Sequence, residues 1–330
     1  MNDDGTFEKL AGGRARISEQ LSKVVVGQSE VVEQVLTALI AGGNCLITGA
    51  PGLAKTLLVK TLADIFSLRF QRIQFTPDLM PSDITGMEIL SESEGVRSMK
   101  FVEGPVFAQM LLADEINRTP PKTQAALLEA MQERQVTVAG KRYELPRPFF
   151  VLATQNPLEM EGTYVLPEAQ LDRFMLCHRL SYPAAGEEEE VLRRTLKLGL
   201  REDGRGAVPR TSFDLLSRGP VASLEDLVRS MGEVQKVHVS EVFVRHAVEL
   251  VRRTRETREI EVGASPRAGI ALVQAARARA YVHGRDYAVP EDLFALAEDV
   301  LLHRIRLRYE ALAEGLTGAT VLRRLVSDVA

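Results

Sequence analysis

The sequence predicts an α/β fold with a parallel sheet, followed by an all-α domain. Three observations support this fold class. A short apolar run, Cys45–Ile47, leads into the glycine-rich segment Gly49–Thr56 and then into a helical pattern. A second apolar run ends in the carboxylates Asp114 and Glu115. Beyond residue 183 the apolar residues recur at helical spacing, which is typical of amphipathic helices.

The segment Gly49–Thr56 reads Gly-Ala-Pro-Gly-Leu-Ala-Lys-Thr and has the arrangement of a phosphate-binding P-loop. Glycines let backbone N–H groups converge on an anion, and the following helix start adds partial positive charge. Lys55 would reach the outer phosphates, and the Thr56 hydroxyl would bind Mg²⁺. Ala54 replaces the usual glycine, and it is small enough for a helical backbone there to leave room for phosphate. The predicted nucleotide-binding residues of this segment are Gly49, Ala50, Pro51, Gly52, Leu53, Ala54, Lys55, Thr56 and Leu57.

The other elements of the first domain are predicted from the spacing of apolar residues and from the glycines and prolines that separate the segments. Strand, P-loop helix and second strand form one βαβ unit, which is expected to be parallel and right-handed. Short strands around Glu94-Gly95 and around Ala139-Gly140 predict two inserted β-hairpins. We expect helices at about 6–21, 29–40, 55–66, 120–133 and 167–172, and core strands at 45–48, 70–75, 107–113, 149–154 and 174–180.

Polar side chains follow two of the buried strands. Asp114 would hold the Mg²⁺ shell, and Glu115 would polarise the attacking water. Asn156, after the next core strand, could hydrogen-bond the γ-phosphate or the water, or could merely begin a turn before Pro157. Ligands bind beyond the carboxyl ends of parallel strands, so these groups are expected beside the P-loop.

The second domain is predicted to begin after Tyr182-Pro183, which divides the chain into 1–183 and 184–330. Only helices are expected beyond this boundary, and residues 201–220, with their glycines and prolines, are expected to form a surface loop. Ser265-Pro266-Arg267 has the composition of a helix start. The expected helices are 187–199, 223–236, 240–257, 266–283, 290–307 and 318–328.

The composition of the 330 residues is that of a soluble globular protein, with 45% hydrophobic and 26% charged residues. A net charge of −4 gives no electrostatic case for binding nucleic acid. No apolar run is long enough to span a membrane, and the polar start shows no secretory signal, so a cytoplasmic protein is expected. Cys45 and Cys177 are expected to be buried, reduced thiols, and no cysteine or histidine spacing suggests a zinc site.

Five segments together resemble the MoxR family of AAA+ ATPases, over nearly the whole chain. They are GAPGLAKT at 49–56, TPDLMPSDITG at 76–86, ADEINR at 113–118, ATQNP at 153–157 and LPEAQLDRF at 166–174. The 76–86 segment is far more specific than the P-loop. Ala54 is the residue that this family usually has there. The resemblance implies an AAA+ P-loop core with two inserted hairpins, followed by an all-α lid domain.

The resemblance also implies roles for individual residues. Asp114 and Glu115 match the Walker B acids, and Asn156 matches sensor 1. Arg173 matches the arginine finger, which in such rings acts on the nucleotide of a neighbouring subunit. Arg267 matches sensor 2, which acts in cis or in trans depending on lid placement, and the sequence leaves both open.

Two further matches concern the edges of the site and the inserts. Gly27 and Gln28 match the segment beside the adenine. The hairpins match the helix-2 insert and the pre-sensor-1 insert of the clade shared with magnesium chelatase. A homo-oligomer is implied, with a hexameric ring as the expected form and the arginine finger supplied in trans.

The expected activity is hydrolysis of ATP with Mg²⁺, in a chaperone-like remodelling motor. MoxR relatives are thought to act with von Willebrand factor A domain proteins in maturation or metal insertion. This chain has no Asp-x-Ser-x-Ser metal-adhesion motif, which marks such domains, so the partner would be a separate chain. The alternatives are a chelatase-type ATPase subunit and a DNA motor, for which Lys141-Arg142 is the only basic hairpin tip. Glu115 and Asn156 argue against a non-hydrolysing switch.

Overall fold

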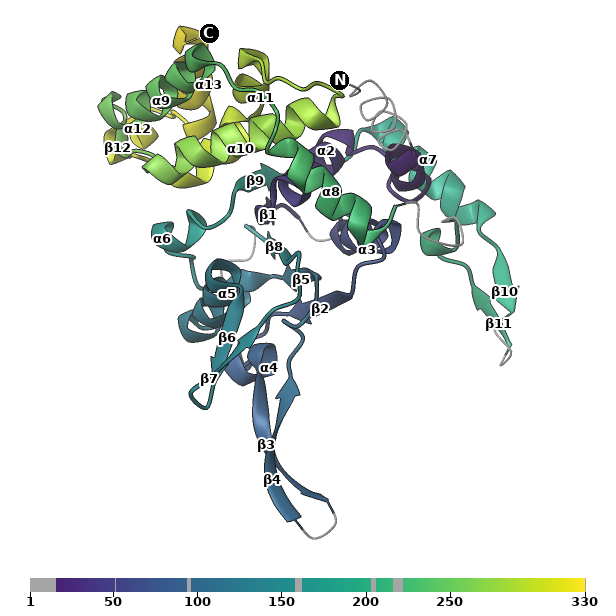
Figure 1. Cartoon of the computed structure of the whole chain (residues 1–330). Coiled ribbons are helices and arrows are strands. Elements are labelled where there is room, and N and C mark those ends of the chain that lie inside the picture. Colours follow the sequence, from purple (N-terminus) through teal and green to yellow (C-terminus); the bar gives the residue numbers. More distant parts are fainter. Residues whose placement is uncertain are drawn as a thin grey trace, which may run out of the picture.

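A computed structural model describes residues 16–50, 52–93, 96–157, 162–202, 206–215 and 222–329 (Figure 1). The first part is built on a five-stranded sheet whose strand order is β2-β5-β8-β1-β9, with every neighbouring pair parallel. The predicted parallel sheet is therefore confirmed. The strands are β1 (Cys45–Thr48), β2 (Phe70–Gln74), β5 (Met110–Asp114), β8 (Phe150–Gln155) and β9 (Leu176–Arg179).

The helices of this part cover the sheet through their apolar faces. Two of them continue the core that the strands begin, because the completely buried Val35 of α2 and Leu62 of α3 join the same apolar cluster as Ile47 of β1. The helices are α2 (Ser29–Ala41), α3 (Lys55–Ile65), α4 (Pro81–Thr85), α5 (Pro121–Glu133) and α6 (Glu168–Leu171). Residues 16–24 are also helical, and the rest of the helix expected at 6–21 lies outside the described residues.

One strand begins later than the sequence suggested. We expected a strand from Phe107, but β5 begins at Met110. Residues 105–109 form a turn instead, in which Ala108 N–H donates to Val106 O at 2.8 Å. Phe107 is buried without joining the sheet, because its ring packs edge-to-face against Phe101 at 5.6 Å. The apolar run therefore predicted the burial of Phe107 correctly, but its prediction that the strand begins at Phe107 was wrong.

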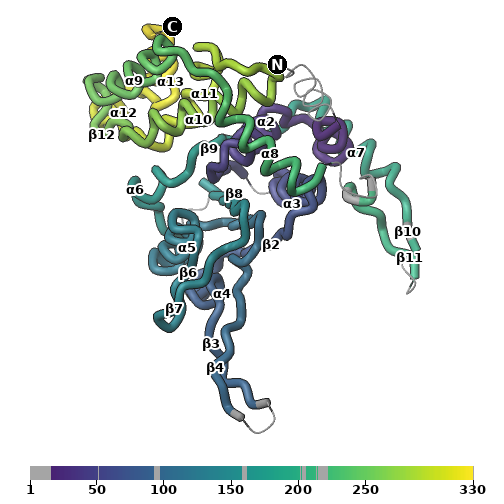
Figure 2. The backbone as a smooth tube through the Cα atoms, in the orientation of Figure 1, coloured from purple at the N-terminus to yellow at the C-terminus, as the bar shows by residue number. Residues whose placement is uncertain are grey.

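Both predicted hairpins are present. The first consists of β3 (Gly86–Ser93) and β4 (Val96–Glu103) and projects away from the sheet (Figure 2). Its predicted turn, Glu94-Gly95, lies outside the described residues. The second consists of β6 (Gln135–Val138) and β7 (Lys141–Glu144). The two hairpins touch each other, since Phe101 stacks on Tyr143 with ring centroids 3.9 Å apart and Lys141 pairs with Glu88 at 3.0 Å.

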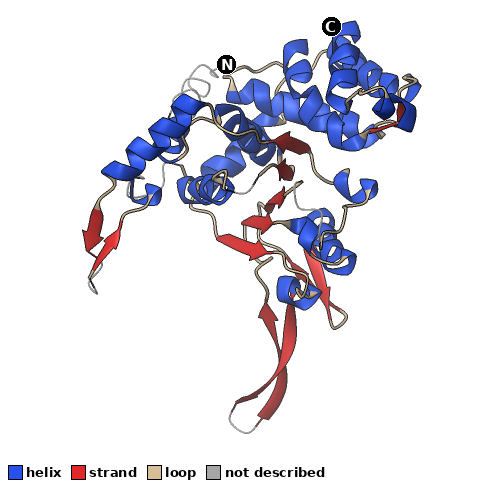
Figure 3. Ribbon diagram, turned by 180° about the vertical axis from the view of Figure 1, so that it is seen from behind, coloured by secondary structure: helices blue, strands red, loops and turns tan. Residues whose placement is uncertain are grey.

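The second part is mainly helical, as predicted, with two short strand pairs that the sequence did not suggest (Figure 3). A pair forms between β10 (Leu200–Glu202) and β11 (Ala207–Pro209), within the segment expected as a loop. Another joins β12 (Ile260–Val262) to β13 (Arg306–Leu307). The helices are α7 (Ala185–Lys197), α8 (Leu224–Val234), α9 (Glu241–Glu256), α10 (Pro266–Val282), α11 (Pro290–Leu301), α12 (Tyr309–Ala313) and α13 (Gly318–Val329).

The two parts share an apolar core. Helices α8 and α10 pack on α2, and α11 packs on β9. The helix expected at 290–307 ends at Leu301, because a tight 3-10 turn, Leu302–Arg304, carries the buried Arg304 back toward the first part. Cys45 and Cys177 are buried free thiols, and burial raises the pKa of Cys177 to about 12. Among the described helices, none has the length and apolar character that a membrane crossing requires.

Candidate nucleotide-binding site

A cavity of about 490 Å³ lies at the carboxyl ends of the central strands. It brings together the predicted groups Lys55, Thr56, Asp114, Glu115 and Asn156, which come from α3, β5 and β8. Further lining residues are Gly52, Leu53, Ala54, Leu57, Arg72, Gln74 and Thr154. Pro51, also predicted to bind the nucleotide, lies outside the described residues.

The backbone of the P-loop is shaped by two small residues. A methyl group added at Gly49 would lie 2.7 Å from Leu180 Cβ and 2.9 Å from Leu180 O, so only glycine fits there. Ala54 has φ 53° and ψ 21°, a left-handed conformation rather than the helical one that we expected. This residue turns the chain into α3, whose first turn has no side-chain cap, and its N–H groups are left available for an anion.

Lys55 is held within the loop. Its Nζ donates a hydrogen bond to Gly49 O at 2.8 Å. Burial lowers the pKa of Lys55, and the charges of Asp114 and Glu115 oppose this shift. A partly buried cation between a P-loop and two carboxylates is suited to bind the outer phosphates of a nucleotide.

Both oxygens of the Asp114 carboxylate accept hydrogen bonds. Its Oδ1 accepts a hydrogen bond from Thr154 Oγ1 at 2.6 Å. Its Oδ2 accepts two from the Arg72 guanidinium, at 3.2 Å from Nε and 2.7 Å from Nη2. Thr154 also accepts a hydrogen bond from Glu115 N–H at 2.9 Å, so one hydroxyl of β8 orients both acids.

Glu115 is held by two other side chains. Its Oε2 accepts a hydrogen bond from Gln74 Nε2 at 2.8 Å and lies 3.0 Å from Arg118 Nε. The residue itself is left-handed, with φ 58°, so it leaves the line of β5 and turns toward the cavity. Asn156 is 4% exposed and lines the same cavity at the end of β8.

Sequence reasoning missed Arg72, Gln74 and Thr154. The alternation along β2 places Arg72 and Gln74 on one face, and this was the available signal. It could not be used without knowing that β2 pairs with β5, in a register that sets Gln74 opposite Asp114.

The donor set of the cavity fits magnesium. Thr56 and Asp114 offer a hydroxyl and a carboxylate oxygen in one cavity. Within the described residues no group of three histidine, cysteine or acidic side chains is placed to hold a metal ion. Mg²⁺ commonly binds through one or two protein oxygens together with phosphate oxygens and water, so a sparse site of this kind suits it.

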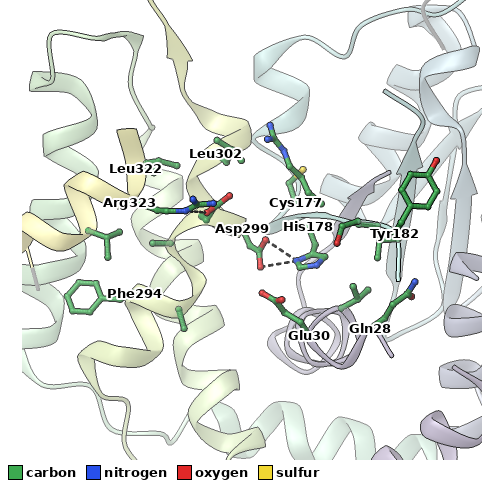
Figure 4. A pocket seen from close by; sticks show the side chains of 18 of the residues that line it. Gln28, Glu30, Cys177, His178, Tyr182, Phe294, Asp299, Leu302, Leu322 and Arg323 are labelled. Carbon is green, nitrogen blue, oxygen red and sulfur yellow. Dashed lines mark hydrogen bonds and ion pairs between the residues drawn. The ribbon is translucent and has the colours of Figure 1, made fainter. Parts of the chain in front are cut away.

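A second cavity, of about 480 Å³, lies where the sheet meets the helical part (Figure 4). Gln28 and Tyr182 line it on one side, and Phe294 and Arg323 on the other. Gly27, next to Gln28, packs so closely on Glu187 that a methyl group there would lie 2.5 Å from the carboxyl group. The predicted adenine segment therefore adjoins the first turn of α7.

The second cavity lies next to the start of the P-loop. Leu180 lines the second cavity and packs on Gly49, where the P-loop begins. Across the second cavity His178 Nδ1 lies 3.1 and 3.2 Å from the two carboxylate oxygens of Asp299, so β9 is tied to α11. Burial alone would lower the pKa of His178, but the hydrogen bond and charge of Asp299 outweigh it and the pKa is raised.

Arg173 and Arg267 line a third, smaller cavity of about 200 Å³, together with Asn44 and Asp172. It shares no lining residue with the phosphate cavity. Asn44 precedes β1 and Arg173 precedes β9, whereas the P-loop follows β1. The two arginines therefore lie at the amino edge of the sheet, about 13 Å, the length of β1, from the edge that carries Lys55.

The two arginines are available to an anion. Arg173 Nη1 donates to Leu128 O at 3.3 Å and to the side-chain oxygen of Gln132, both neutral acceptors. Arg267 is exposed and forms no ion pair with any carboxylate of the described residues. A pair of guanidinium groups that lacks carboxylate partners is suited to bind phosphate.

Comparison with known proteins identifies related chains over almost the full length. Residues 44–176 match the ATPase family associated with various cellular activities (AAA), and residues 252–325 match the AAA lid domain. The chain is 40% identical to "Chaperone MoxR1" of Mycobacterium tuberculosis, over 94% of this chain and 80% of that one. It is 31% identical to "Protein MoxR" of Methylorubrum extorquens, over 88% and 87%. A solved structure from Cytophaga hutchinsonii, assigned as an ATPase, superposes with a TM-score of 0.87 at 40% identity, covering 99% of this chain and 97% of that one.

Proposed function

Because the chain belongs to the MoxR family of AAA+ ATPases and hydrolyses ATP, we propose that it is a chaperone-like remodelling motor that acts with a von Willebrand factor A domain protein on a separate chain. Maturation of that partner or of a protein it presents, or metal insertion into it, is the proposed outcome. A cytoplasmic location is part of the same proposal.

ATP with Mg²⁺ is the proposed cofactor pair, and the phosphate cavity is the proposed site. The residues Gly49 to Leu57 would surround the phosphates, with Lys55 on the outer ones. Thr56 and Asp114 would hold Mg²⁺, which would supply positive charge to neutralise the phosphates. Glu115 would orient and polarise the attacking water, and Asn156 would hydrogen-bond the γ-phosphate or that water.

The second cavity is the proposed site of the base. Gln28 lines it, and Gly27 packs on Glu187 in the first turn of α7. The contact of Gly49 with Leu180 supports a nucleotide that runs from one cavity to the other. The proposed units are 1–183 and 184–330, and the base would lie between them.

We propose that Arg173 and Arg267 both act in trans. The observation that carries this is their common cavity at the sheet edge opposite the P-loop. An arginine finger typically contributes about 10³–10⁵ in rate, and this contribution requires direct contact with the γ-phosphoryl group. A neighbouring subunit, in a proposed hexameric ring, would bring these arginines to the phosphates.

Mixing two inactive variants tests this proposal. Arg173→Ala keeps its phosphate cavity intact but lacks the finger, and Glu115→Gln keeps its finger but lacks the residue for water attack. Each alone should be inactive. An equal mixture should recover activity, because about a quarter of neighbouring pairs would join an intact cavity to an intact finger. The ATPase rate per wild-type subunit should also rise with protein concentration.

The contrary outcomes are clear. A mixture as inactive as its components, or a wild-type rate independent of concentration, would show that the site is complete within one chain. Substituting Arg267→Ala for Arg173→Ala in the same mixture tests the second arginine separately. Capture of a von Willebrand factor A domain protein by the ATP-bound Glu115→Gln variant tests the proposed partner.

The structure offers no support for the alternative that the chain is a DNA motor. Of its candidate pair, Lys141-Arg142, Lys141 is paired with Glu88 at 3.0 Å. Its neighbour Arg142 is also exposed at the hairpin tip, in a chain whose net charge is −4. An ATPase rate that does not respond to added DNA is the expected result.

A further inference from the structure

A single carboxylate connects the two segments that carry the arginines. Asp172 immediately precedes Arg173, and Ser265 begins the helix that carries Arg267. Ser265 Oγ donates a hydrogen bond to Asp172 Oδ2 at 3.1 Å. The other oxygen, Asp172 Oδ1, lies 3.1 Å from Arg304 Nε. Asp172 therefore lies at a junction of three segments, two from the helical part and one from the sheet domain.

Arg304 holds the backbone on both sides of Arg173. Its Nη2 donates to Phe174 O at 2.7 Å and lies 3.4 Å from Asp172 O. His303 Nε2 also contacts Phe174 O, at 3.1 Å. The three residues Asp172, Arg173 and Phe174 are thus fixed by the 3-10 turn that follows α11.

Burying the charged Arg304 guanidinium at this junction opposes folding, because the group loses its hydration. Arg304 is 9% exposed, and its Nε and Nη1 have no hydrogen-bond partner among the described residues, so Nε faces Asp172 Oδ1 as an ion pair and not as a hydrogen bond. Burial lowers the pKa of Arg304 to about 10, against the opposing charge of Asp172. Buried ion pairs often contribute little net stability compared with apolar side chains of similar size. The geometry that the pair imposes is therefore a better explanation for it than the free energy of folding.

We propose that Asp172 and Arg304 are positioning residues that hold Arg173 and Arg267 as one rigid pair for the nucleotide of the neighbouring subunit. This inference rests on the proposed role of the two arginines in trans. Neither Asp172 nor Arg304 touches the nucleotide. They determine where the two guanidinium groups stand relative to each other, and a shift of about 1 Å at a reacting centre can change a rate by about 10²-fold.

The same turn connects the pair to the subunit's own second cavity. Asp299, near the end of α11, lines that cavity and bonds His178, and Arg304 follows five residues later on the continuous α11 and 3-10 turn. A shift of α11 caused by a nucleotide in the subunit's own site would therefore move Asp172, Arg173 and Arg267 together. This gives a physical route by which one site influences the next.

The test is Asp172→Asn, which keeps the shape of the side chain but removes its charge opposite Arg304. The maximal ATPase rate should fall by about 10- to 100-fold, with the affinity for ATP unchanged. The variant should reduce ATP hydrolysis in the phosphate cavity of the neighbouring subunit and not in its own. Mixed with Glu115→Gln, whose arginines are intact, Asp172→Asn subunits should recover activity. The double variant Asp172→Asn with Glu115→Gln should fail to rescue Arg173→Ala. A residue needed only for folding would not show this asymmetry.

Arg306→Ala is the matched control. Arg306 joins the same two segments, through Glu168 at 2.7 Å and Glu261 at 3.0 Å, but its side chain is 54% exposed. It should leave the rate within about twofold, since exposed pairs are weak. Ser265→Ala, which removes the hydrogen bond to Asp172 and the one that Ser265 Oγ accepts from Arg267 N–H at 3.2 Å, repeats the test if Asp172→Asn unfolds.

Two outcomes separate this inference from the proposal beneath it. If Arg173→Ala is inactive and Asp172→Asn, or Ser265→Ala in its place, keeps the wild-type rate and rescues Arg173→Ala when combined with Glu115→Gln, the positioning role is wrong and the role in trans stands. If Arg173→Ala itself keeps the wild-type rate, the role in trans is wrong and the positioning role falls with it.

Discussion

The guanidinium of Arg72 donates two hydrogen bonds to one oxygen of Asp114, at 3.2 and 2.7 Å, inside the phosphate cavity. Asp114 is the carboxylate proposed to hold Mg²⁺. A metal ion that approaches Oδ2 must therefore displace a cation already bound there. The pair is half-exposed on the arginine side and 16% exposed on the aspartate side, so its contribution is intermediate between a surface pair and a buried one.

Arg72→Ala should make Mg²⁺ bind more easily. The concentration of Mg²⁺ for half-maximal nucleotide binding is expected to fall by about two- to fivefold, because the competing cation is gone. Fluorescence of an ATP analogue, titrated with Mg²⁺ in the Glu115→Gln background, measures this without hydrolysis. Arg69→Ala, which removes an exposed pair with Glu103, is the control. A higher Mg²⁺ requirement would instead show that Arg72 helps to hold the phosphates.

Glu115→Gln should separate ATP binding from hydrolysis. Loss of the group that polarises water should lower the maximal rate by about 10²- to 10⁴-fold. Affinity for ATP should stay within about twofold, because an amide can keep the hydrogen-bonding shape. Gln74→Ala should act in the opposite direction and raise the basal rate, since it removes one partner of Glu115 Oε2. Steady-state ATPase assays check both, and an unchanged rate for Glu115→Gln would contradict its role.

Gly49→Ala should lower both stability and nucleotide affinity. The added methyl group would meet Leu180 Cβ at 2.7 Å and Leu180 O at 2.9 Å, and backbone cannot turn aside as a flexible side chain can. Overpacking of this kind costs about 1–3 kcal/mol. Gly232→Ala is the matched control, because a methyl group meets nothing within 4 Å inside α8. It should stabilise the protein by about 0.5–1 kcal/mol. Chemical unfolding curves would show the opposite signs.

His178→Gln should change how stability depends on pH. The pKa of His178 is raised above its ordinary value of 6.5, because Asp299, with Glu30 and Glu298 nearby, outweighs the effect of burial. The protonated form therefore favours the folded state. Its contribution is complete below about pH 6.5 and is lost as pH rises through the folded pKa.

Unfolding midpoints measured between pH 6 and pH 8.5 test this expectation. The loss of stability in His178→Gln should be larger at pH 6 than at pH 8.5. A difference between variant and wild type that is the same across this range would mean that folding does not change the pKa of His178. Asp299→Asn should reproduce the altered pH dependence, because it removes the main charge that raises the pKa.

Much of the core could be predicted because its signals are local. The apolar runs that form β1, β5 and β8 end in polar residues, and each such end is visible within ten residues of sequence. The parallel sheet then places these ends at one edge. By contrast, Arg72 reaches Asp114 only because β2 pairs with β5, a partnership that no local pattern reveals.

The errors have similar causes. The pair of β12 and β13 joins Ile260 to Leu307, so each short strand makes sense only beside a distant partner. Phe107 was assigned to a strand because it is apolar, and its burial beside Phe101 satisfies the same preference without a strand. The roles of Arg173 and Arg267 could be inferred only from resemblance, because arginine at a helix end is common and their shared cavity depends on the packing of α10.

The position of the phosphate cavity and the arginine pair at opposite edges of the sheet gives the assembly a direction. A two-fold symmetric dimer would set like against like and would complete no site. A head-to-tail row completes one site at each junction, so the phosphate cavity of one end subunit always lacks the arginine pair of a neighbour. Closing the row into a ring supplies that cavity with arginines as well. On the proposed arrangement, the rate per subunit would therefore rise again when the ring closes, beyond the rise that pairing alone produces.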